Sequence, residues 1–167
     1  TFQITSIVPG FTTLDNVALA AQARAGTSLR FWGRAAGDRR LNERARAALA
    51  EVGLDHRAAV PAGTLAHGEK RALELAVALA LEPKVLVLDE PMAGVGVDEG
   101  ARLIALLQGL KPRLPMLLIE HDTAAVFRLA DRVSVLVYGR VIASGTPAEV
   151  RADPAVREAY LGEETAL

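Results

Sequence analysis

Cysteine is absent from the 167 residues, which excludes both a disulfide framework and a thiolate metal site. A strong charge of one sign is also missing. The net charge is −1, whereas nucleic-acid-binding proteins usually carry a large basic excess. The longest apolar run, residues 75–81, stops at Glu82, far short of the roughly 18 residues that a membrane span needs. The first residues show no basic start followed by an apolar segment, so no signal peptide is predicted.

What is present indicates a globular domain. Hydrophobic residues make up 51% of the chain and charged residues 23%, and the length is about that of one domain. The chain begins with Thr1 rather than Met, so we expect it to be a piece of something longer.

Apolar periodicity predicts helices in the first part of the chain and alternating strands and helices after Lys84. The first helix begins near Thr13, with Thr13 or Asp15 as its cap. Further helices are predicted at residues 38–52, 68–81, 97–110, 122–129, 147–150 and 154–161, and strands at residues 85–88, 116–119, 133–137 and 141–143. This order favours a layered α/β sheet preceded by a helical subdomain.

The run at residues 85–88 is followed at once by Asp89, Glu90 and Pro91. Four consecutive apolar residues are typical of a strand buried on both faces of a parallel sheet. Ligands of open α/β sheets bind at the carboxyl ends of the strands, where two acids could hold a metal ion and steer a water. The alternative is a core strand that happens to end in a solvated acidic turn.

Two further positions fit a phosphate site. Gly68 opens a predicted buried helix, where free backbone N–H groups and the helix dipole favour an anion. His121 directly follows another predicted strand. Taken singly, each has a plain structural explanation, as a capping glycine and a hydrogen-bonded histidine. Their spacing around Asp89 and Glu90 makes the functional interpretation stronger.

With these motifs in order, the chain resembles the nucleotide-binding subunits of ABC transporters, and most closely those of branched-chain amino-acid importers. Phe2-Gln3 is similar to the Q-loop, residues 65–69 to the signature motif and residues 85–90 to Walker B. The D-loop, the switch histidine and the subgroup's tail correspond to residues 93–96, His121 and residues 160–163.

The resemblance implies a P-loop NTPase-like ABC ATPase core, a mostly parallel sheet flanked by helices, with a helical subdomain and with its N-terminal strands missing. Its implied parts are residues 1–81 (Q-loop, helical subdomain and signature helix), 82–145 (Walker B and switch histidine) and 146–167 (helical tail). It also implies an ATP-hydrolysing subunit that docks on integral membrane permease subunits at the cytoplasmic face of the cell membrane, with no nucleic acid involved.

The family also implies residue roles. Asp89 and Gln3 would hold Mg²⁺, Glu90 would polarise the attacking water, and Gln3 and His121 would complete the catalytic set. The signature residues would bind the γ-phosphate of ATP held by a second ATP-binding subunit, identical or not; they are Leu65, Ala66, His67, Gly68 and Glu69.

Several positions depart from the family pattern. Ala66 stands where a serine is usual, and His67 and Glu69 replace glycine and glutamine, while Val95-Gly96 replaces the D-loop aspartate. Reduced turnover is therefore expected. No G-x-x-x-x-G-K-[ST] sequence occurs in these residues, so they alone are expected to be inactive. We also expect exposed apolar sheet edges that are covered by oligomerisation or strand exchange.

Two other functions remain open at this point. A non-transport ABC ATPase, acting in DNA repair or translation, would be expected to show long insertions, zinc-binding cysteines or basic patches, and this sequence shows none of them. A non-catalytic ABC-fold binding protein would be consistent with Ala66 and the altered D-loop, but Glu90 and His121 speak against it.

Overall fold

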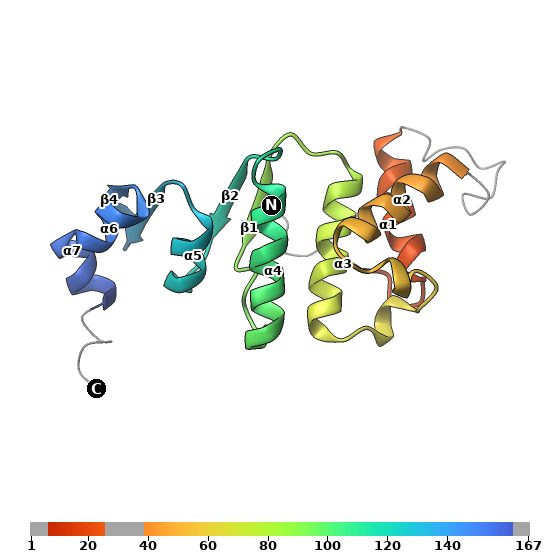
Figure 1. Cartoon of the computed structure of the whole chain (residues 1–167), viewed down its shortest axis with the longest axis horizontal. Helices are drawn as coiled ribbons and strands as arrows, with labels where there is room; N and C mark the ends of the chain where they lie inside the picture. The colour runs from red at the N-terminus through yellow and green to blue at the C-terminus, as the bar shows by residue number, and fades with distance from the viewer. Residues whose placement is uncertain (1–6, 26–38, 162–167) are drawn as a thin grey trace. The chain divides into compact units, whose positions relative to one another are not determined.

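The computed structural model describes residues 7–25 and 39–161. The chain divides into two compact units, Thr1–Ile119 and Glu120–Leu167, and we describe each by itself. The described residues of the first unit form these elements (Figure 1): α1 (Thr13–Arg24), α2 (Arg39–Glu51), the 3-10 turns η2 (Asp55–Arg57) and η3 (Ala62–Thr64), α3 (His67–Ala80), β1 (Leu86–Asp89), α4 (Val97–Leu110) and β2 (Met116–Ile119).

Helix α1 begins at Thr13, where the sequence predicts, but its cap is a different residue. The Thr12 side chain accepts a hydrogen bond from the Asp15 N–H over 3.1 Å, and the Asp15 carboxylate accepts from the Thr12 N–H over 3.3 Å. This reciprocal pair is a capping box. The prediction of Thr13 or Asp15 as the cap is therefore wrong: the cap is Thr12, one residue before Thr13, and Asp15 is the third residue of the helix and the partner of the cap.

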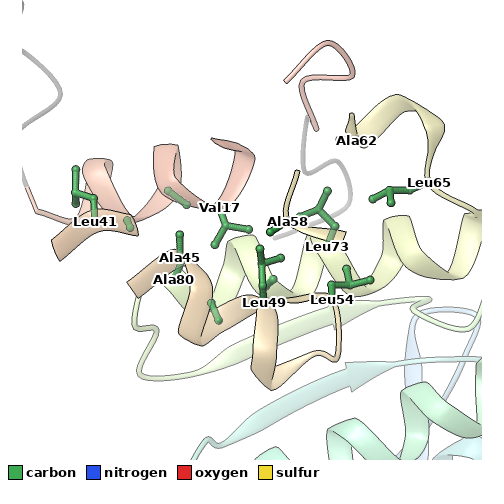
Figure 2. Close-up of a cluster of buried hydrophobic side chains, with 14 residues drawn as sticks. Val17, Leu41, Ala45, Leu49, Leu54, Ala58, Ala62, Leu65, Leu73 and Ala80 are labelled. Carbon is green, nitrogen blue, oxygen red and sulfur yellow. The ribbon is translucent and has the colours of Figure 1, made fainter. Parts of the chain in front are cut away.

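The hydrophobic core of the first unit lies between α1, α2 and α3 (Figure 2). Val17, Leu49 and Leu73 are fully buried and come from one helix each. Leu54 and Leu65, from the segments between α2 and α3, pack into the same cluster. Each buried leucine contributes about 1.5–3 kcal/mol. The core therefore fixes both the helices and the segment that leads into α3.

Strands β1 and β2 pair in parallel, with Leu86 opposite Met116 and Asp89 opposite Ile119. A hydrogen bond of 2.8 Å from the Glu90 N–H to the Ile119 carbonyl extends the ladder by one residue. Parallel pairing is as predicted, but burial on both faces is not. Leu86 is buried, whereas the other three residues of β1 are partly exposed, because β2 is the single strand that pairs with β1 among the described residues.

The second unit holds α5 (Thr123–Leu129), β3 (Val133–Val137), β4 (Arg140–Gly145), α6 (Pro147–Ala152), α7 (Pro154–Val156) and the π-helical turn η4 (Arg157–Leu161). Strands β3 and β4 form an antiparallel hairpin with a bulge next to Val135. Its turn, Tyr138-Gly139, has φ of +48° and +76°, the handedness that suits a two-residue hairpin loop. The Arg151 guanidinium lies 4.5 Å from the centre of the Phe127 ring and joins α6 to α5.

The elements follow the predicted order, from a helical part to alternating strands and helices. None of the helices in the described residues is long and apolar enough to cross a membrane.

Candidate functional site

The two candidate acids lie at the carboxyl end of β1. Asp89 is its last residue, and Glu90 follows in an exposed turn with φ of +46°. A side chain other than glycine in the left-handed region is uncommon, and such residues cluster at functional sites. The conformation is held by two backbone hydrogen bonds, from the Glu90 N–H to Ile119 and from the Ala93 N–H to the Glu90 carbonyl over 3.1 Å. The backbone thus turns sharply at the residue expected to activate water.

A cavity of about 50 Å³ lies behind Asp89, between α3, β1 and α4. Asp89, Arg71 and Glu74 contribute its charged wall, and leucines supply most of the rest. Arg71 donates a hydrogen bond of 3.0 Å to Glu74, and the Arg71 Nε has no partner. The space suits a water molecule or two and is far below the several hundred Å³ of a ligand pocket. It is therefore not the nucleotide site.

The start of α3 carries the signature-like residues. Ala66 is the N-cap, with extended backbone (φ −62°, ψ 164°), and its N–H donates to Glu69 Oε2 over 2.9 Å. This is half of a capping box; the other half needs a side-chain oxygen, which alanine lacks. Glu69 Oε1 also accepts a hydrogen bond of 2.7 Å from Arg57 Nε. The hydrogen bond from Arg57 lowers the pKa of the Glu69 carboxyl below its usual value, and the hydrogen bond from the Ala66 N–H lowers it further.

His67 and Gly68, which follow the N-cap, lie against the segment after Glu90. A Cβ placed on Gly68 would lie 2.5 Å from Glu99 Cδ, so the carboxylate of Glu99 fills the space that a side chain at 68 would need. A Cβ on Gly94, whose φ is +70°, would lie 3.4 Å from His67 Nε2. The structure therefore brings the signature-like and D-loop-like segments together.

The remaining signature-like residue, Leu65, has its side chain buried in the hydrophobic core. Its part in any phosphate site would come from its backbone. Arg57 and Glu99 are contacts that the sequence analysis missed. A long spacing of 12 residues separates Arg57 from Glu69, and no pattern marks it. Glu99 stands out in the sequence merely as an acid in the first turn of a helix.

His121 belongs to the second unit, two residues beyond β2. Its side chain is largely exposed, and its Nδ1 lies 3.9 Å from Glu120 Oε2. The same carboxylate oxygen accepts hydrogen bonds from the His121 N–H (3.0 Å) and the Asp122 N–H (3.3 Å). Asp122 in turn caps α5 by accepting from the Ala125 N–H over 3.1 Å. Glu120 and Asp122 thus order the turn that presents His121.

Phe2 and Gln3 lie outside the described residues. Among the residues that are described, no group of three or more His, Asp or Glu side chains gathers at one point to hold a metal. Asp89 could supply one carboxylate ligand. This fits Mg²⁺, which is commonly bound by one or two carboxylates together with waters and substrate phosphates.

A family model described as ABC transporter matches residues 1–93, more than half of the chain, so the chain belongs to the ABC transporter family. A second model, described as branched-chain amino acid ATP-binding cassette transporter, matches residues 140–166. The expected family is confirmed, and the second match agrees with the expected subgroup.

Curated relatives point to the same subgroup. The chain is 43% identical over 117 residues to the high-affinity branched-chain amino acid transport ATP-binding protein BraF of Pseudomonas aeruginosa; the match covers 69% of this chain and 46% of that protein. It is 40% identical over 123 residues to LivG of Escherichia coli, covering 72% and 48%. The match thus spans about half the length of these relatives.

The fold is similar to that of a solved ATP-binding cassette of an ABC transporter in its ADP conformation. The TM-score is 0.79 at 29% identity, over 96% of this chain and 66% of the other. A nucleotide-free ATP-binding cassette gives a TM-score of 0.78 at 28% identity, with the same coverage. The predicted class, an α/β ABC ATPase core with a helical subdomain, is confirmed.

Proposed function

We propose that the protein carrying this chain is the ATP-binding and ATP-hydrolysing subunit of an ABC importer that powers uptake of branched-chain or related amino acids. The observation that supports this most is the pair Asp89–Glu90 at the carboxyl end of a parallel strand in a chain of this family. The subgroup and the cargo class rest on the names of the relatives. As in that class, the subunit would work on permease subunits at the cytoplasmic face of the membrane.

The residues divide the chemistry among them. Bound Mg²⁺ would shield the phosphate charge, and Asp89 would hold it from the end of β1, with Gln3 as a second ligand. Glu90, exposed and with a left-handed backbone, would orient the attacking water and take up its proton. His121 would contact the γ-phosphate. Ala66, His67, Gly68 and Glu69 would offer the start of α3 to ATP held by a second ATP-binding subunit.

Hydrolysis by the whole protein with Mg²⁺ and ATP, measured as phosphate release, tests this proposal. Glu90→Gln keeps the shape of the side chain but removes its basicity, so the rate should fall by about 10²- to 10⁴-fold while ATP binding persists. Glu82→Gln is the matched control, since Glu82 is also a glutamate with positive φ (+50°). Hydrolysis that survives Glu90→Gln would reject the assigned role. The 167 residues alone are expected to be inactive.

A non-catalytic ABC-fold binding protein is the second candidate, favoured by the missing hydroxyl at Ala66. The same assay separates the two functions. In the second case the wild-type protein would bind ATP without releasing phosphate, and Glu90→Gln would change nothing.

A further inference from the structure

The Arg57–Glu69 pair is a contact that the proposed mechanism does not use. Arg57 ends the 3-10 turn η2, and its backbone is fixed by hydrogen bonds to Leu54 (2.9 Å) and from Val60 (2.9 Å). Its guanidinium therefore starts from a fixed backbone when it donates to Glu69 over 2.7 Å. The Arg57 and Glu69 side chains are 43% and 23% exposed, so solvent screens part of the attraction between them.

Charge at this place matters if a phosphate binds at Gly68. Glu69 is the next residue along the first turn of α3, and the Glu99 carboxylate already lies against Gly68. An unpaired Glu69 carboxylate would add a second negative charge at the point where an anionic phosphate must approach. A negative charge in the first turn of the helix opposes the binding of an anion there. The low pKa of Glu69 means that protonation does not remove this charge near neutral pH.

We propose that Arg57 is a positioning residue of the phosphate-binding segment: it holds and neutralises Glu69, so that a nucleotide phosphate can approach Gly68. This inference rests on the proposed function. It explains how a glutamate can stand at a position in the first turn of α3 where a neutral glutamine would serve. Both side chains can cap the Ala66 N–H, but the glutamate needs a cation beside it.

A purely structural role makes a different prediction. If Arg57 merely braces the start of α3, its loss should lower stability and phosphate affinity together. Making residue 69 neutral would then restore neither of them. If Arg57 compensates charge, adding Glu69→Gln should restore affinity, although the ion pair and its share of stability remain lost.

The test is a titration of inorganic tripolyphosphate into the isotope-labelled chain, followed by NMR at the amides of Gly68 and Glu69. Arg57→Ala should weaken binding by about 3- to 5-fold. The double variant Arg57→Ala/Glu69→Gln should return to wild-type affinity. Thermal unfolding should show both variants less stable than wild type. Arg39→Ala is the matched control, because it breaks another Arg–Glu pair of the first unit (3.0 Å to Glu43) and should leave affinity unchanged.

Three results would overturn the proposal: wild-type affinity in Arg57→Ala, weak binding that persists in the double variant, or no saturable change at Gly68 in the wild-type chain. Since the readout is anion binding, its failure is distinct from that of the proposed function. If Glu90→Gln did not change hydrolysis, the proposed function would be rejected. The result that the double variant binds phosphate as wild type does would still hold.

Discussion

At the scale of single residues, Ala66 stands where the family usually has a serine, and this difference also affects the start of helix α3. Its backbone has the extended conformation of an N-cap, and Glu69 already accepts its N–H. The one missing part of the capping box is an oxygen on residue 66 that would accept the Glu69 N–H. The serine that is usual in the family would supply this oxygen.

Ala66→Ser should therefore raise the free energy of unfolding by about 0.5–2 kcal/mol, measured by chemical denaturation. The isosteric pair Ala66→Thr and Ala66→Val isolates the hydroxyl, and only the threonine variant should gain stability. Turnover is a separate question, answered with the same serine variant in the whole protein. If Ala66→Ser hydrolyses ATP no faster than wild type, the missing hydroxyl does not limit the rate.

Residue types and their spacing were sufficient to place Asp89, Glu90 and Gly68 correctly on their elements. The left-handed backbone of Glu90 was not predictable, because a glutamate gives no local signal for positive φ; the neighbouring hydrogen bonds to Ile119 and Ala93 impose it. Arg57 was missed for a related reason. Its contact with Glu69 depends on the path of the chain between α2 and α3, and no local sequence pattern indicates that path.

At the scale of secondary-structure elements, Asn16 ties α1 to the segment before it. The side chain is 5% exposed. Its Oδ1 accepts from the Val8 N–H over 2.8 Å, and its Nδ2 donates to the carbonyls of Val8 (3.1 Å) and Thr12 (2.9 Å). One buried amide thus satisfies both backbone groups of Val8 and positions the chain that enters α1.

Asn16→Ala should lower the free energy of unfolding by about 1–3 kcal/mol, because it leaves partly buried backbone groups without partners. Hydrogen exchange at the Val8 amide should quicken as well. Leu19→Ala on the exposed side of α1 is the control, and it should change stability by no more than about 0.5 kcal/mol. Equal effects of the two variants would show that the Asn16 network adds nothing to stability.

Element boundaries followed the sequence where a local signal exists. Helix α4 spans the predicted residues, and β3 does also. Strand β4 is longer than the predicted residues 141–143, because pairing with β3 extends it at both ends. The predicted burial of β1 was too high. An apolar run shows that a strand can be buried on both faces, but the actual burial depends on the elements that pack against the strand.

At the scale of the whole molecule, the described strands form two sheets of two strands each. Strand β2 pairs through one edge with β1, and no other described strand pairs with its second edge. Leu117 and Ile119 share one face of β2 and are 56% and 47% exposed. Apolar side chains beside an open strand edge are a recognised cause of association between chains.

We therefore expect the 167-residue chain to associate with itself through β2. Light scattering after size-exclusion chromatography, over a series of concentrations, should give a mass above that of the 17.7 kDa monomer. Leu117→Lys places a charge on this face and should shift the chain toward monomer. Val97→Lys is the matched control: Val97 is 92% exposed but lies at the start of α4, so the same change there should leave the mass as in wild type. A monodisperse monomer at all concentrations would contradict the prediction, and an equal response to both lysines would exclude β2 as the contact.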